Sequence, residues 1–172
     1  MLTLLKIVQS LFKALNSEGT PGQVAAGIAV GSALGLTPLV SLHNLIIVAA
    51  IALLNISVPG AIVGWLVAVP FGFLLDPVFH LIGRWLLVEV LPLVPVWTTV
   101  YNTPVLSLAN FNNTVVLGSL VGWIVLWIPI YLVGRMAVRR YRKTVYPKLA
   151  KSRLFKAVQA SKLYNLYRLF QP

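Results

Sequence analysis

The chain has 172 residues, of which 59% are hydrophobic and only 10% charged, with a mean hydropathy of +0.89. Ordinary globular domains are about half apolar and about a quarter charged, so this composition indicates a membrane protein of one domain. Cysteine is absent, which excludes disulfides, thiolate metal sites and a cysteine nucleophile.

The charge is basic and unevenly distributed. Fourteen Lys and Arg residues stand against three acids, the formal net charge is +11, and eleven of the fourteen lie from Arg135 onward. This basic segment directly follows a predicted membrane span, where such clusters mark the cytoplasmic side and contact anionic lipid. We therefore expect lipid, and no nucleic acid, as the partner of the basic surface.

Residues 1–18 predict an amphipathic N-terminal helix, because apolar residues recur at helical spacing in MLTLLKIVQSLFKAL. We expect this helix either to lie in the membrane interface or to pack against the rest of the protein. Its two lysines lie inside the apolar part and no small-x-small cleavage site follows, so no cleavable signal peptide is expected.

Residues 19–91 predict a core of short helices, with Thr20 as N-cap and Pro21 as first helical residue. Prolines and Asn55 interrupt an uncharged run. The apolar pieces that remain are Gln23–Thr37, Leu39–Leu54 and Ala61–Leu75. Each piece reaches only about 22–24 Å, whereas a bilayer's hydrocarbon core is about 30 Å thick. We expect broken or re-entrant helices, which cross the membrane either once with a hairpin or three times.

The first piece carries glycines at i, i+4 and i+8, namely Gly27, Gly31 and Gly35. A smooth helix face of this kind lets two helix backbones approach closely in lipid. We expect these glycines to serve helix packing, and a direct ligand role is the alternative.

The break at Pro38 is surrounded by a polar group that we call the break cluster. It consists of Thr37, Ser41, His43 and Asn44. Either these side chains satisfy backbone carbonyls freed at the tip of a hairpin, or they form a polar pocket opposite Asp76.

A second polar group, called the polar stripe, consists of Asp76, His80 and Arg84 at i, i+4 and i+8. Residues at this spacing share one helix face. Asp76 directly precedes Pro77, which predicts that it caps a new helix. The stripe is expected either to neutralise itself as a structural triad, with Arg84 alternatively at the membrane interface, or to bind a polar substrate such as a lipid headgroup or phosphate.

The second half predicts a loop, one clean span and a basic tail. Residues 92–114 combine prolines, aromatics and four asparagines without charge, and indicate an extracytoplasmic loop. Residues 115–137 predict a transmembrane helix that ends at a basic cluster, which the positive-inside rule places in the cytoplasm together with both termini.

Residues 138–172 predict a cytoplasmic amphipathic tail on anionic lipid, with docking to a partner subunit as the alternative. The residues expected to contact anionic lipid are Arg135, Arg139, Arg140, Arg142, Lys143, Lys148, Lys151 and Arg153.

No catalytic signature is present in the sequence. It contains no HExxH, no GxSxG and no P-loop, and its two histidines and three acids offer no credible metal set. We expect a protein that is not an enzyme, without cofactor or metal.

The segments PGQVAAGIAVGSALGLTPL, LHNLIIVAAIALLNISVPGAIVGW and HLIGR resemble the domain of unknown function 2062, found in small bacterial inner-membrane proteins. The shared pattern is a glycine-spaced helix ending in Pro38, then an apolar helix ending in Asn55 and Pro59. Family members commonly carry Asn-Pro where this chain has Val69-Pro70. The architecture is also remotely similar to the DedA and VTT membrane proteins, a resemblance that implies re-entrant hairpins and lipid translocation.

Three functions are expected from these features. The first is a non-enzymatic inner-membrane component of lipid transport or translocation, working with a larger protein partner that spans or faces the periplasm. The second is a structural or assembly subunit that anchors a membrane complex through its glycine faces and basic tail. The third is a small transporter for an acidic or phosphorylated solute that uses Arg84.

Overall fold

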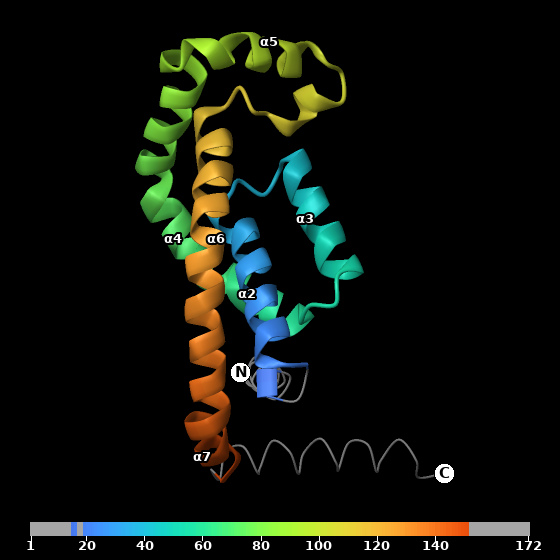
Figure 1. Ribbon diagram of the computed structural model, residues 1–172, viewed down its shortest axis with the longest axis vertical. Helices are drawn as coiled ribbons and strands as arrows, with labels where there is room; N and C mark the ends of the chain where they lie inside the picture. The colour runs from blue at the N-terminus through green and yellow to red at the C-terminus, as the bar shows by residue number, and fades with distance from the viewer. Residues whose placement is uncertain (1–14, 17–18, 152–172) are drawn as a thin grey trace, which may run out of the picture.

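The computed structural model describes residues 15–16 and 19–151, and this part of the chain is helical without any strand (Figure 1). Its elements are α2 (Pro21–Leu36), α3 (Leu42–Leu53), α4 (Val58–Arg84), a π-helical turn η1 (Trp85–Glu89), a 3-10 turn η2 (Leu91–Leu93), α5 (Val94–Asn102), a 3-10 turn η3 (Leu106–Ala109), α6 (Thr114–Arg140), a π-helical turn η4 (Tyr141–Val145) and α7 (Tyr146–Lys151). Most of the amphipathic helix predicted for residues 1–18 and the part of the predicted tail from residue 152 onward lie outside the described residues.

Helix α2 begins where the sequence predicts. The Thr20 hydroxyl accepts from the Gln23 N–H at 3.2 Å, and the Gln23 side chain accepts from the Thr20 N–H at 2.7 Å. Pro21 stands in the first turn, where its missing N–H costs nothing. The helix ends at Leu36 because Pro38 restricts Thr37 to extended backbone.

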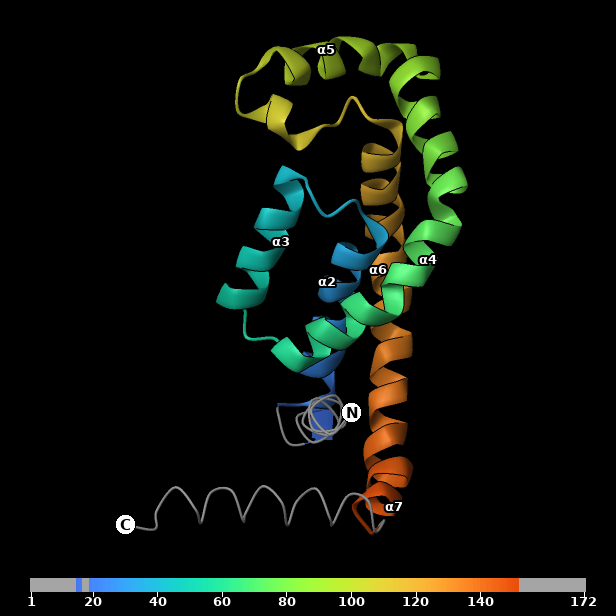
Figure 2. The same cartoon turned by 180° about the vertical axis from the view of Figure 1, so that it is seen from behind.

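Helices α2 and α3 form a hairpin, in which α3 returns alongside α2 (Figures 1 and 2). After α3 the chain returns to the first turn of α2, where the Ser57 N–H donates to the Gln23 carbonyl at 3.2 Å. In both figures the connection between α2 and α3 lies well below the top of the molecule, and both outer ends of the hairpin point toward the same end of it.

Helix α4 corrects two sequence predictions. It runs unbroken from Val58 to Arg84, so the predicted end at Leu75 is wrong, and Asp76 lies inside the helix instead of capping one. Pro70 and Pro77 are both accommodated within it. Each proline removes one helical hydrogen bond and crowds the preceding turn, and such positions bend helices instead of ending them when the surroundings support the bend. Figure 2 shows the bend plainly.

Within the described residues, two helical runs are long and apolar enough to cross a membrane. They are Val58–Glu89, with 32 residues, and Thr114–Lys148, with 35 residues. The sequence predicted only the second of them as a full-length span. The second run also continues past residue 137. The basic residues that follow belong to the same helical run through α6, η4 and α7, and no separate tail begins at residue 138.

Glycine faces hold α2, α4 and α6 together. A methyl group added at Gly27, Gly31 or Gly35 would overlap atoms of Ser57, Ala61 or Trp65–Val69. The partner face of α4 is equally smooth, with Gly60, Gly64 and Gly72 against the α2 backbone. This is close helix packing, and it occupies the glycine face within the chain.

The upper part of α4 packs on α6 in the same way. Gly83 abuts the Thr114 backbone and Gly118 abuts the Phe79 backbone, so neither position has room for a side chain. Trp123 on α6 completes the three-helix contact, because its indole N–H donates to the Ala29 carbonyl of α2 at 2.9 Å.

Residues 91–113, which we call the lid, contain short helices where the sequence predicted an extracytoplasmic loop. Helix α5 lies across the top of α4 and α6 (Figure 1). Pro95 stands in its first turn, and Thr98 and Thr99 return hydrogen bonds of 2.9 Å to the carbonyls of Val94 and Pro95. The Trp97 indole fastens α5 by donating to the Leu86 carbonyl at 2.9 Å.

Candidate functional site

The polar stripe of α4 does not pair with itself. The His80 Nδ1 lies 2.8 Å from the Thr114 hydroxyl of α6, and the Arg84 Nε lies 3.9 Å from Glu89 Oε1. The side chains of Arg84 and Glu89 are 63% and 56% exposed, so their pairing is weak. The predicted self-neutralising triad is therefore wrong, because two of its members have partners elsewhere.

Asp76 is the stripe residue that enters a cavity. A cavity of about 510 Å³ lies between the end of α2, the bend of α4 and the start of α6. Its lining includes Asp76 and Thr37, and it brings together one residue of the stripe and one of the break cluster. His80 and Arg84 do not line it.

The walls of this cavity are otherwise apolar. The remaining lining residues are Leu34, Gly35, Leu36, Pro38, Leu39, Trp65, Val69, Gly72, Phe73 and Val115. The Nε1 of Trp65 is buried and has no hydrogen-bond partner. Sequence reasoning offered a pocket between the break cluster and Asp76 as an alternative, but it missed Trp65 and the apolar walls, because the lining comes from three helices distant in sequence and depends on the bend of α4.

The break cluster supplies hydrogen-bond donors to the backbone carbonyls at the tip of the hairpin. The Asn44 amide donates to the carbonyls of Pro38 at 2.8 Å and Leu39 at 3.2 Å, and the Ser41 hydroxyl donates to the Pro38 carbonyl at 3.0 Å. The Thr37 hydroxyl lies 2.9 Å from the Ala33 carbonyl and 3.0 Å from Asn44 Oδ1. These contacts correspond to the first interpretation, and Thr37 in addition faces the cavity.

His43 links the hairpin tip to the lid. Its ring stacks on Phe111 with centroids 6.3 Å apart and planes 14° apart, and its Nε2 lies 3.1 Å from the Ser41 hydroxyl. The buried Nδ1 has no partner.

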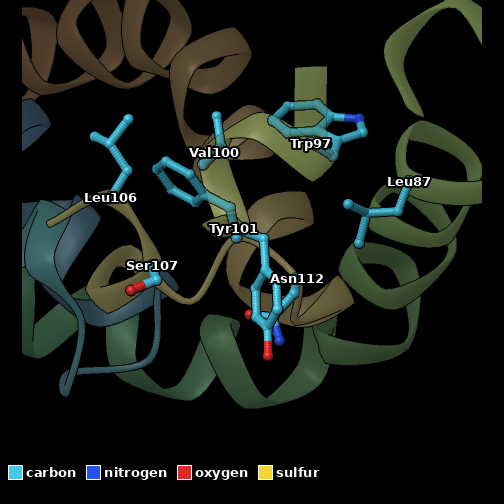
Figure 3. Close-up of a pocket in the computed structure, with 8 residues that line it drawn as sticks. Leu87, Trp97, Val100, Tyr101, Leu106, Ser107 and Asn112 are labelled. Carbon is cyan, nitrogen blue, oxygen red and sulfur yellow. The ribbon is translucent and has the colours of Figure 1, made fainter. Parts of the chain in front are cut away.

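The lid covers a second, smaller cavity of about 50 Å³. Figure 3 shows Trp97, Val100 and Tyr101 of α5 around it, with Ser107 of η3 and Leu87 of η1 on opposite sides. It is too small for more than a few water molecules, and it offers no charged side chain.

The basic cluster divides into engaged and exposed residues. Arg142 is engaged within the protein, because its guanidinium donates to the Leu15 carbonyl at 2.7 and 2.9 Å and to the Gly19 carbonyl at 3.0 Å. A role limited to lipid contact is therefore wrong for Arg142. The exposed members are Arg139, Arg140, Lys143 and Lys148.

The remaining members of the predicted lipid contact are less well defined. Arg135 is partly buried, and its Nε has no hydrogen-bond partner. Lys151 ends α7, and Arg153 lies outside the described residues. Within 15–16 and 19–151, no group of three His, Asp or Glu residues could hold a metal ion.

From residue 19 to residue 151 the fold is all-helical, with two helices long enough to span a membrane and, beside a helical hairpin, a cavity lined by one carboxylate. The chain belongs to the family described as uncharacterized protein conserved in bacteria (DUF2062), whose model matches residues 5–145.

An uncharacterized protein of Treponema pallidum (strain Nichols) is 32% identical over 164 residues, which cover 93% of this chain and 98% of the relative. No solved structure matches. The resemblance to the domain of unknown function 2062 is thus confirmed, whereas these matches do not support the remote likeness to DedA and VTT proteins.

Proposed function

We propose that the protein is a non-enzymatic membrane component that helps lipid headgroups cross the bilayer along the polar stripe of α4. One observation carries this proposal. An acid, an imidazole and a guanidinium lie on one face of a helix that is otherwise apolar, and none of them is fully buried by other helices. Ionisable groups on a membrane helix are costly unless they meet water, headgroups or one another.

The proposed orientation follows from the basic cluster. Arg139 and Arg140 lie exposed at the end of α6, and positive clusters of this kind favour the cytoplasmic side. Helices α4 and α6 then span the inner membrane, the α2–α3 hairpin enters and leaves from the cytoplasm, and the lid faces the periplasm. Both termini are cytoplasmic in this arrangement, because there are two crossings.

The geometry favours lipid over a small acidic solute. Arg84 lines neither cavity and is largely exposed, so no enclosed site surrounds its guanidinium. From Asp76 to Arg84 the stripe extends about 12 Å along the helix, which is a substantial part of a hydrocarbon core of about 30 Å. A headgroup that moves along such a face keeps a polar neighbour while its acyl chains stay in the membrane.

The experiment is a lipid-flip assay on the full-length protein reconstituted in vesicles with a phospholipid that carries its fluorophore on an acyl chain, so that the headgroup is unaltered. We expect the protein to accelerate the quenching of inner-leaflet fluorescence by dithionite, and Arg84→Gln to reduce this acceleration. Arg140→Gln is the matched control, because it removes the same charge at the other end of the molecule. The absence of any acceleration by the unaltered protein, alone or with a co-purified partner, would exclude this function.

The larger periplasmic partner remains part of the proposal. A structural or assembly role would instead require free packing faces, and the glycine face of α2 is already occupied by α4. Co-purification of the full chain from native membranes is the direct test. If Asp76→Asn and Arg84→Gln abolish lipid transport while the complex co-purifies intact, the assembly role is excluded.

A further inference from the structure

The cavity beside the α2–α3 hairpin has the chemistry of a lipid site. It measures about 510 Å³, within the range of pockets that hold small organic molecules. Leu34, Leu39, Val69 and Phe73 give it hydrocarbon walls. An empty apolar space of this size in a membrane protein fills most favourably with an acyl chain, since water finds few partners there.

The single charge in the lining is an unpaired carboxylate. Among the described residues none forms a hydrogen bond or ion pair with Asp76, although it is partly buried. The nearest basic side chains along its own helix face are directed elsewhere, because His80 contacts Thr114 and Arg84 contacts Glu89. A carboxylate removed from water is stabilised by a cation, and an anionic ligand would instead be repelled.

One uncharged polar group lies in the same wall. The Thr37 hydroxyl uses its single proton on the Ala33 carbonyl or the Asn44 side chain, so its remaining lone pair is available to a donor on a ligand. The cavity therefore offers one negative charge and one acceptor among apolar walls.

The distance between Trp65 and Asp76 along α4 restricts the shape of the ligand. Trp65 and Asp76 are eleven residues apart on α4, which corresponds to about 16 Å along a straight helix axis. A compact solute cannot contact both, whereas a molecule with a headgroup, an ester region and acyl chains can.

We propose that this cavity binds a phospholipid with a cationic amine headgroup. The ammonium group pairs with Asp76 and donates to the Thr37 hydroxyl, and an acyl chain runs along the apolar walls as far as the Trp65 ring. This inference rests on the proposed function and names its substrate class. It assigns the ammonium to Asp76, where the sequence alone pointed to phosphate recognition at Arg84.

The experiment measures lipid retention by native mass spectrometry. Full-length protein is released from nanodiscs that contain equal amounts of phosphatidylethanolamine and phosphatidylglycerol, and separately of phosphatidylethanolamine and its N-acetyl derivative. The N-acetyl lipid keeps the chains, esters and phosphate but loses the positive charge. We expect roughly tenfold preferential retention of the free amine in both comparisons, as expected for one charged contact worth about 1.4 kcal/mol.

Two substitutions separate the parts of the site. Asp76→Asn is expected to abolish the headgroup preference. Glu89→Gln removes the same charge outside the cavity and is expected to leave the headgroup preference unchanged. Trp65→Ala removes part of the apolar wall, and it is expected to lower total lipid retention severalfold without changing the headgroup ratio. Trp85→Ala is its control, because Trp85 is 54% exposed and does not line the cavity.

Equal retention of the amine and N-acetyl lipids by the unaltered protein would overturn this inference, and that result does not depend on the folding of any variant. Preserved preference in a folded Asp76→Asn protein would also overturn it. The flip assay tests the proposed function separately from the lipid preference. If the protein flips lipid but retains the amine and N-acetyl lipids equally, this inference is wrong and the proposed function stands. If it prefers the amine lipid but does not flip lipid, the proposed function is wrong and the binding site stands.

Discussion

Single glycine residues determine how closely the helices approach. At Gly31 an added methyl group would overlap the Ala61 backbone, whereas at Gly134 the nearest atoms to such a methyl lie 3.7 Å away, in ordinary contact. Backbone atoms cannot move aside as a flexible side chain can, so the two positions differ although both are glycines in helices.

We expect Gly31→Ala to destabilise the protein by about 1–3 kcal/mol or more, because α2 and α4 must move apart. Gly134→Ala is the matched control and is expected to change stability by less than about 1 kcal/mol, since alanine also favours the helix. Thermal unfolding of both variants in the same detergent measures the difference. Equal unfolding midpoints would contradict the packing described here.

Arg142 connects two distant parts of the chain by its three hydrogen bonds to the carbonyls of Leu15 and Gly19. Hydrogen bonds from a charged donor contribute roughly 1.5–3 kcal/mol each when well formed, and less when they are partly exposed. We expect Arg142→Gln to lower the unfolding midpoint in detergent, whereas Arg139→Gln, at an exposed position, leaves it unchanged. The opposite order would show that Arg142 serves only as a surface charge.

At the scale of elements, local signals in the sequence predicted some boundaries well. Thr20, Pro21 and Gln23 specify the start of α2 through contacts within three residues, and the hairpin was one of the two arrangements anticipated. The prediction failed where the outcome depended on distant partners. Pro70 and Pro77 were interpreted as breaks, yet glycine contacts with α2 and α6 on either side support one bent helix.

The candidate site was predictable only in part for the same reason. The sequence pointed to Asp76 and Thr37 as polar residues in apolar surroundings. It gave no indication that Trp65 and Val115 line the same cavity, because these positions meet only after α4 bends and α6 returns. The lid was also missed, since its short helices rest on contacts such as that between Trp97 and the Leu86 carbonyl.

The bend of α4 is itself testable. We expect Pro70→Ala to restore a hydrogen bond to the Leu66 carbonyl and to straighten the helix. The chain has no cysteine, so spin labels at Leu66→Cys and Leu81→Cys report the change without further engineering. The distance between the labels should increase toward the value for a straight helix, where fifteen residues extend about 22 Å.

Pro129→Ala is the control for this measurement, since α6 runs nearly straight past Pro129 (Figure 1). It should leave the distance across α4 unchanged. An unchanged distance in Pro70→Ala would show that Pro70 does not produce the bend.

At the scale of the whole molecule, the proposed arrangement predicts opposite sidedness for two exposed positions. Asn55 follows the hairpin and Leu108 lies in the lid. In spheroplasts, a membrane-impermeant maleimide should label Leu108→Cys and should label Asn55→Cys only after permeabilisation. Labelling of Asn55→Cys from outside would mean that α2 and α3 do not return to the cytoplasm.

Helix α3 is held mainly at its two ends. The Ser57–Gln23 hydrogen bond closes the hairpin at one end, the His43–Phe111 stack joins the lid at the other, and only His43, Asn44 and Ile47 of the helix are buried. Segments with so few buried contacts open locally at a lower free energy than the core around them. The amide hydrogens of α3 should therefore exchange before those of α2, which makes α3 the arm of the hairpin that opens at the lower free energy.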